Sequence, residues 1–282
     1  MLCLATRWND RRRLAREPAE VPGERRPRDA ADGAVDGERQ RGAIAMNRIN
    51  DDIHLVTETH QYVLKRNKNQ KFKSVTTIVG EYFKKFDKIG VSERLTDGHP
   101  KYMHLTPAEL RAEWDATTQL GTDIHEEIDQ YLRNSRPATL RRASIGINWL
   151  RQYLKAPMNK VISEVILYSV ELGIAGTVDL LVEVPGTGTY EIIDWKTGKL
   201  DFESHQGETA PHHITSDLMD CHFEKYTLQL SMYRYLLEKY YGFKIRNQVI
   251  AHLGEDNCEG YPTPYHKSHI EAIINDQRNS RT

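Results

Sequence analysis

The sequence predicts an α/β fold in which helices flank a mixed central β-sheet. Two observations indicate this class. After residue 80 the predicted elements run in the order helices, three strands, helix and strand, which is typical of a sheet covered by helices. The 282 residues are 39% apolar and include 14 tyrosines. This is enough for a core in one large domain or two small ones.

The first 45 residues differ in composition from the rest of the chain. They contain ten Arg, no Lys and few large apolar residues. Such a segment cannot bury enough surface to offset the entropy lost on ordering. We therefore expect residues 1–45 to be a disordered extension, or a start assigned too early with Met46 as the true initiator. The folded domain would span residues 46–282. A transit peptide is the rival interpretation, but the segment contains eight acidic residues, whereas transit peptides are poor in acids.

The N-terminal half of the domain begins with strand-like segments and continues as helices. Residues 53–64 and 72–79 are rich in β-branched and aromatic residues, and the polar turn 67–69 separates them. They predict an N-terminal β-hairpin. Residues 80–133 are predicted to be a mostly helical insertion. Its best helix covers residues 106–132, with Thr106 as N-cap, Pro107 at the first position and Glu109 close to the capping-box position. Gly121 would mark a break.

The C-terminal half contains the sheet-forming segments. A helix is predicted over residues 140–155, followed by strands at 161–169, 176–184 and 189–197. The sequence PGTG at 185–188 predicts a turn between the last two strands. The remaining elements are a long loop (200–222), a helix (224–241), a strand (244–253) and a short helix from His269.

The hairpin formed by strands 176–184 and 189–197 carries the candidate chemistry. Side chains alternate between the faces of a strand, so Asp194 and Lys196 share one face. By the same rule Asp179 shares a face with Thr177, Leu181 and Glu183. A four-residue loop pairs Val184 with Thr189, and this register places Asp179 opposite Asp194. Like charges at opposed positions are destabilising, so the pair needs a partner such as a divalent cation.

A cation between two carboxylates, with a lysine beside them, meets the needs of phosphodiester hydrolysis. A metal ion lowers the pKa of bound water and polarises the phosphoryl oxygen. Lys196 would offset negative charge and point at a phosphate or a water molecule. The alternative is an exposed hairpin whose Asp and Lys side chains are simply solvated, and the hairpin alone does not decide between the two.

Four further motifs carry a resemblance to a known family. Residues 193–199 (IDWKTGK), preceded by 176–179 (GTVD), resemble the RecB-type branch of the PD-(D/E)xK nuclease superfamily. Residues 121–125 (GTDIH) look like its GxxxH helix motif, and residues 229–233 (QLSMY) look like its QxxxY motif. Residues 74–78 (SVTTI) are similar to a segment of phage, viral and mitochondrial single-strand exonucleases. The resemblance spans about residues 72–253 and implies a restriction-endonuclease-like core.

The resemblance implies a set of metal ligands. His125 would bind the metal ion from a helix. Asp179 and Asp194 would be the carboxylate ligands, and the main-chain carbonyl of Trp195 would be a further ligand. The expected cofactor is Mg²⁺ or Mn²⁺.

The resemblance also implies roles in catalysis and substrate binding. Lys196 would orient or activate the attacking water, and Glu164 would be an auxiliary acid. Gln229 and Tyr233 lie one helical turn apart and would contact DNA or hold Lys196. The family's cluster-binding cysteines are missing, because Cys3, Cys221 and Cys258 cannot supply four thiolates.

These features predict a metal-dependent deoxyribonuclease, specifically an exonuclease acting on single strands or DNA ends in repair or recombination. The alternatives are a structure-specific endonuclease and a non-catalytic DNA-binding subunit of a recombination or repair complex. The net charge of −1 means that DNA must bind to a local basic patch. Replication or recombination proteins are possible partners. No apolar run approaches the roughly 20 residues of a membrane helix. The few cysteines favour the cytoplasm or another reducing compartment, such as the nucleoid or a virus's host cell, over secretion.

Overall fold

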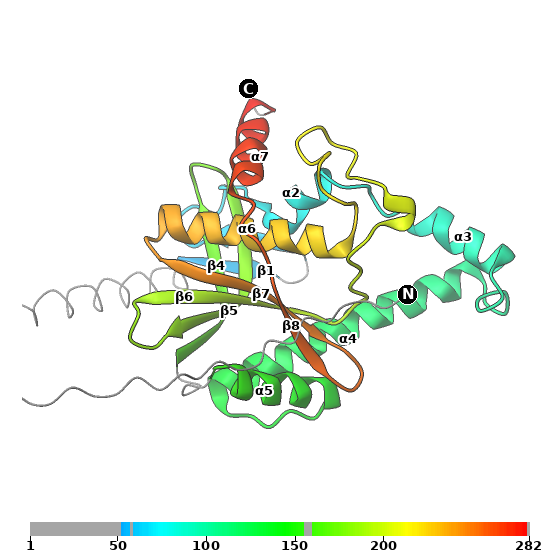
Figure 1. Cartoon of the computed structure of the whole chain (residues 1–282), viewed down its shortest axis with the longest axis horizontal. Coiled ribbons are helices and arrows are strands. Elements are labelled where there is room, and N and C mark those ends of the chain that lie inside the picture. The colour runs from blue at the N-terminus through cyan, green and yellow to red at the C-terminus, as the bar shows by residue number, and fades with distance from the viewer. Residues whose placement is uncertain (1–51, 57–58, 155–159, 281–282) are drawn as a thin grey trace, which may run out of the picture. The chain divides into compact units, whose positions relative to one another are not determined.

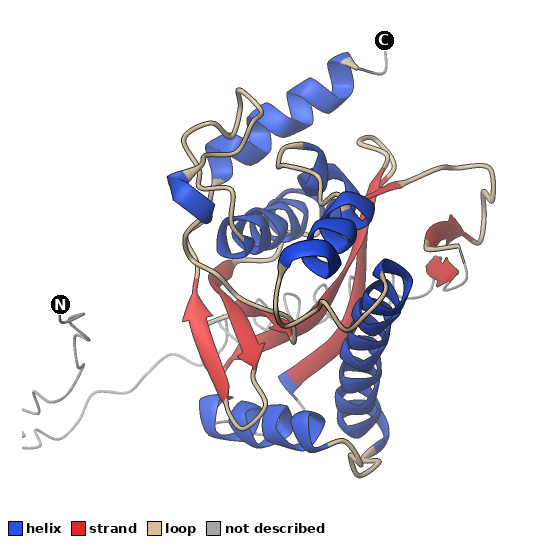
Figure 2. Ribbon diagram, turned by 90° about the vertical axis from the view of Figure 1, so that its right-hand side faces the viewer, coloured by secondary structure: helices blue, strands red, loops and turns tan. Residues whose placement is uncertain are grey.

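The computed structural model describes residues 52–56, 59–154 and 160–280, all within the unit Arg41–Thr282. The expected extension over residues 1–45 and the expected initiator Met46 lie outside these residues. The predicted class is confirmed, since helices flank a mixed β-sheet (Figures 1 and 2). Within the described ranges, no helix is both long and apolar enough to span a bilayer.

The central sheet has six strands. Five lie in the order β3-β5-β6-β7-β8, and β4 also pairs with β5. Their bounds are Lys73–Ser74 (β3), Val161–Ser169 (β4), Ile174–Val184 (β5), Thr189–Lys196 (β6), Ile245–Leu253 (β7) and Cys258–Pro262 (β8). The run β4-β5-β6 is antiparallel, whereas β6 pairs with β7 in parallel. The sequence prediction found β4 to β7 and missed the edge strand β8.

Helices cover both faces of the sheet and enclose two cores (Figure 1). On one face lie α2 (Val75–Glu81), α6 (His222–Tyr240) and α7 (Lys267–Asn279). On the other lie α4 (Pro107–Asn134) and α5 (Arg141–Leu154), and α3 (Lys88–Gly98) packs on α4. Strand β6 alternates between the cores, because Ile192 packs on the α6 side whereas Ile193 and Trp195 pack on the α4 side.

The N-terminal hairpin differs from the prediction. The two strands are β1 (Ile53–Val56) and β2 (Gln61–Leu64), so the whole hairpin lies inside the segment expected to be one strand. The second predicted strand, 72–79, is wrong beyond Ser74, where helix α2 begins. The Ser74 hydroxyl accepts a hydrogen bond from the Thr77 amide at 3.0 Å. This cap and the burial of Val75, Ile78 and Val79 on one helical face outweigh the β-branched composition.

Helix α4 confirms the predicted start and contradicts the predicted break. Thr106 and Glu109 form the capping box, with Pro107 at the first helical position. The helix continues through Gly121 to Asn134, and Ser135 ends it in a left-handed conformation. A single glycine costs about 1 kcal/mol in a helix, which a helix of 28 residues can tolerate.

Candidate metal centre and active site

Strands β5 and β6 separate at the level of the two predicted acids. The predicted register is confirmed from Val184–Thr189 to Leu180–Ile193, and the next pair in sequence is Asp179 and Asp194. There the ladder ends. The Trp195 amide donates instead to the Asp179 carboxylate, with 2.7 Å between N and Oδ2. Because the strands part at this point, side chains from both helical layers can reach the same place.

A third acid, Glu164, lies next to these two aspartates on strand β4, and the three are called the acid row below. Ser163 pairs with Leu180 and Val165 with Val178, so Glu164 lies beside Asp179. Glu164 has a φ of 50°, a left-handed conformation that costs roughly 1–2 kcal/mol in a residue other than glycine. Glu164, Asp179 and Asp194 thus come from three successive strands.

The irregular residue in β4 coincides with a change of side-chain direction in β5. Val178 and Leu181 both pack in the core on the α6 side, whereas Leu180 packs on the α4 side. Thr177 lies by the N-terminal hairpin, where its hydroxyl is 3.0 Å from that of Tyr62. The expectation that side chains alternate strictly from Thr177 to Glu183 is therefore wrong. The alternation between the two faces is interrupted at Asp179, which lies beside the left-handed Glu164.

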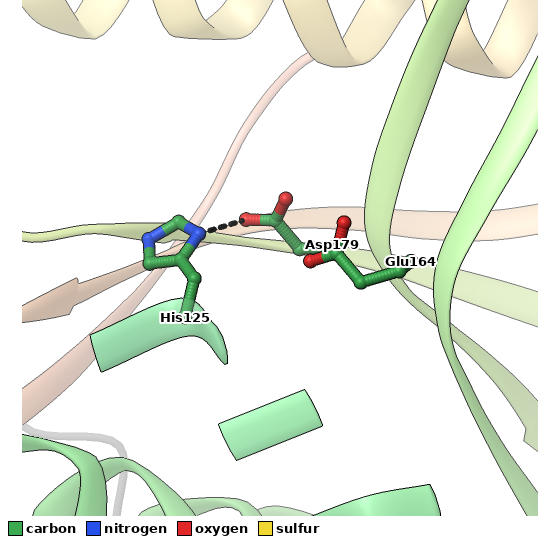
Figure 3. A group of neighbouring side chains, drawn as sticks. All are labelled: His125, Glu164 and Asp179. Atoms are coloured by element: carbon green, nitrogen blue, oxygen red, sulfur yellow. Dashed lines mark ion pairs between the residues drawn. The ribbon is translucent and has the colours of Figure 1, made fainter. Parts of the chain in front are cut away.

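His125 completes a cluster of possible metal ligands (Figure 3). It projects from α4, and its Nδ1 is 3.5 Å from Oδ2 of Asp179. One ligand atom each from His125, Glu164 and Asp179 lie within 4.8 Å of one another. Burial first, and then the charge of Lys196, lower the pKa of His125 to about 4. The imidazole is therefore neutral near pH 7, which is the form that binds metals.

Burial makes the carboxylates of the row difficult to ionise without a cation. Burial, followed by the charges of Asp179 and Asp129, raises the pKa of Glu164 to about 8. Burial also raises the pKa of Asp194 to about 6, although Lys196 opposes this change. The pKa of Asp179 is raised mainly by burial. These shifts come first from burial, which disfavours the ionised form of each carboxylate.

Lys196 forms an ion pair with Asp194. Its side chain is 16% exposed, and its ammonium contacts Oδ2 of Asp194, which is 1% exposed. Burial alone would lower the pKa of Lys196, but Asp194 and Asp179 raise it above its ordinary value. Lys196 is therefore an ammonium group at neutral pH.

Gln229 and Tyr233 lie on α6, above the strand separation. The Gln229 amide donates to Oδ1 of Asp194 at 3.2 Å and is 3.2 Å from the Tyr233 hydroxyl. Both residues are buried. Gln229 thus contacts Asp194, the ion-pair partner of Lys196, and the role of holding Lys196 itself stays a prediction. Contact with DNA stays a prediction, as does the role of the Trp195 carbonyl as a ligand.

Two tyrosines that sequence reasoning missed adjoin the site. The Lys196 ammonium lies over the ring of Tyr226, 4.5 Å from its centroid. Tyr226 precedes Gln229 by three residues, and this helical spacing was the available signal. Tyr62 has no comparable local signal, because it reaches Thr177 from the separate N-terminal hairpin.

Helix α4 also lies against β4 and against the residue after β6, on the two sides of the site. Arg133 Nε donates to Asp129 Oδ1 at 2.7 Å, and Arg133 Nη2 donates to the Ser163 carbonyl at 2.9 Å, next to Glu164. At Gly121 the helix approaches the end of β6 closely. A Cβ at this position would lie 2.6 Å from Oγ1 of Thr197.

Comparison with known proteins identifies the family of this chain. The family model of the PD-(D/E)XK nuclease superfamily matches residues 59–252. No curated protein matches. A solved structure titled "Crystal structure of SSO0001" is similar at 14% identity and a TM-score of 0.36, covering 86% of this chain and 85% of that one. Nucleases of the matched superfamily typically use divalent metal ions. Because the family model spans more than half of the 282 residues, and the match contains the acid row, His125 and Lys196, the chain belongs to the PD-(D/E)XK nuclease superfamily.

Proposed function

We propose that this protein is a Mg²⁺- or Mn²⁺-dependent deoxyribonuclease that acts as an exonuclease on single strands or DNA ends. One observation carries the proposal. Three carboxylates from adjacent strands, Glu164, Asp179 and Asp194, lie near a neutral imidazole and a half-buried ammonium where the sheet opens. A divalent cation would compensate the charge of such a row when its carboxylates ionise, and nucleases of the matched superfamily typically use divalent metal ions.

The donor set fits a divalent ion. Carboxylate oxygens from Glu164 and Asp179 and a ring nitrogen from His125 lie within 4.8 Å of one another. Asp194 follows on the next strand. Carboxylate oxygens suit Mg²⁺ and Mn²⁺, and an imidazole ligand shifts the preference towards Mn²⁺. When bound, such an ion activates a water molecule and stabilises charge on the phosphate.

The chain's own residues have distinct tasks in this proposal. Gln229 fixes one oxygen of Asp194, so that the carboxylate keeps one orientation. Asp179 is held by the Trp195 amide. Lys196 presents an ammonium to a non-bridging phosphate oxygen and orients the attacking water. The water oxygen bonds to phosphorus, the bond from phosphorus to the 3′ oxygen breaks, and the products are a 5′-phosphate and a 3′-hydroxyl.

The test is a cleavage assay on linear single-stranded, linear double-stranded and circular single-stranded DNA. We expect cleavage of linear DNA with Mg²⁺ or Mn²⁺ and none with a chelator. Asp194→Asn and Lys196→Met should each reduce kcat by at least about a hundredfold. Asp256→Asn is the matched control, because Asp256 is an exposed acid paired with Arg141. Cleavage without metal, or full activity in both site variants, would refute the proposal.

Circular single-stranded DNA separates the two modes of cleavage. An exonuclease requires a free end and leaves the circle intact. Cleavage of the circle at the rate of the linear strand would replace the exonuclease assignment with an endonuclease. Metal-dependent DNA binding without cleavage of any substrate would indicate a non-catalytic subunit.

A further inference from the structure

The ammonium of Lys196 contacts two side chains of the described structure. One is the Asp194 carboxylate and the other is the face of the Tyr226 ring, with 4.5 Å between Nζ and the ring centroid. The Tyr226 ring projects from α6 and is partly buried against the core on that side of the sheet. Burial raises its pKa, so it is a neutral phenol. A cation over the face of a desolvated aromatic ring is attracted by the ring quadrupole.

Both groups of the Asp194–Lys196 pair are held by one face of α6. Tyr226 and Gln229 are three residues apart, so they project from neighbouring positions of that face. Gln229 donates to Asp194 Oδ1, and Tyr226 covers the Lys196 ammonium. The helix therefore contacts the carboxylate and the ammonium separately.

We propose that Tyr226 is a positioning residue for Lys196. Its ring holds the ammonium beside Asp194 and gives the ammonium a second partner besides that carboxylate. The inference rests on the proposed function, since it concerns the same metal centre. A divalent cation and the ammonium compete for the Asp194 carboxylate. The ring face offers the ammonium a second attraction that does not consume a ligand of the metal ion. Loss of the ring should therefore strengthen the competition and weaken metal binding.

The first measurement is the affinity of the full chain for Mg²⁺ by calorimetry, without DNA. Tyr226→Leu removes the ring face, and we expect the Kd for Mg²⁺ to rise about three- to thirtyfold. Tyr226→Phe keeps the face and should restore the affinity to within about twofold. In the Lys196→Met background the ammonium is gone, so adding Tyr226→Leu should change the affinity no further. On DNA, Tyr226→Leu should lower kcat by a similar factor and leave KM little changed.

A matched control lies on the same helix. Lys239 lies over the ring of Tyr235 at 5.1 Å and donates to its hydroxyl at 2.7 Å, in a second cation–ring pair away from the metal centre. Tyr235→Leu should lower stability without altering Mg²⁺ affinity. Thermal unfolding in chelator checks that each variant is folded, and Tyr226→Met replaces the leucine variant if that one is not.

Several outcomes would overturn the inference. The first is an unchanged Mg²⁺ affinity in Tyr226→Leu. The second is a Tyr226→Phe variant that binds Mg²⁺ as weakly as Tyr226→Leu. The third is a loss of Mg²⁺ affinity in the Lys196→Met background that equals the loss in the wild-type background. The calorimetric result does not depend on cleavage. Failure of the proposed nuclease activity would appear as uncut DNA with normal metal binding, and is therefore distinguishable.

Discussion

The acid row makes a specific prediction about stability in the absence of metal. Glu164→Gln keeps the size of the side chain and removes its charge. In the folded protein the pKa of Glu164 is raised to about 8 from 4.5, first by burial and then by Asp179 and Asp129. Between these values the folded state keeps a proton that the unfolded state has lost. Wild-type stability contributed by this group therefore falls as pH rises through that window.

The size of the effect follows from the same values. One pKa unit corresponds to about 1.36 kcal/mol, so the interval from 4.5 to about 8 sets a ceiling of about 5 kcal/mol. Glutamine has no proton to lose. We expect the free energies of unfolding of wild type and Glu164→Gln to be similar at pH 5. At pH 8 in chelator the variant should be more stable by a few kcal/mol.

The assay is urea unfolding from pH 5 to pH 8.5, first with chelator and then with Mg²⁺. The ion should stabilise the wild type at pH 8 and remove most of the difference, because it compensates the charge that the variant lacks. Glu113→Gln, at an exposed position of α4, is the control and should follow the wild type. Parallel pH profiles for wild type and Glu164→Gln in chelator would refute the reasoning, as would a less stable variant at pH 8.

Three further predictions concern the contacts of α4 at Gly121 and Arg133 and the binding of the metal ion. Gly121→Ala should weaken Mg²⁺ binding in calorimetry, because its Cβ would lie 2.6 Å from Thr197 Oγ1. Adding Thr197→Ala to the same chain should restore binding. If binding is not restored, this contact is excluded as the cause. Arg133→Met should lower the urea-unfolding free energy by about 1–3 kcal/mol, since it removes the donors to Asp129 and to the Ser163 carbonyl; an unchanged midpoint would contradict that role. Mg²⁺ at about a hundred times its Kd should stabilise the wild type by about 2.7 kcal/mol, measured as the shift in unfolding free energy, and a shift of the same size in Asp179→Asn would argue against this site.

Features encoded by local chemistry were predictable from the sequence. The four-residue turn at 185–188 fixed the register that brings Asp179 and Asp194 to the same level, and the structure confirms that register up to the neighbouring pair. The start of α4 followed from Thr106, Pro107 and Glu109, whose roles depend only on residues within one turn.

Features that depend on distant contacts were not predictable in the same way. Segment 72–79 has a strand-like composition, yet the cap at Ser74 and burial against α6 make most of it helical. The left-handed conformation of Glu164 has no signal in its neighbours. This conformation occurs where β4 contacts other elements, and one of these contacts is the hydrogen bond from Arg133 to the carbonyl of Ser163. The role proposed for Tyr226 depends on the position of the Lys196 ammonium over its ring, which is a contact between α6 and β6.

The hydrogen bond from the Trp195 amide to Asp179 gives the protein a spectroscopic reporter of its own. This amide belongs to the sheet backbone, but its acceptor is a side chain of the metal centre. Any change in the charge on that carboxylate must alter the shielding of the amide proton and its exchange with solvent. Occupation of the centre can therefore be followed at one backbone resonance, in the native chain and without a label on the ligand or the DNA.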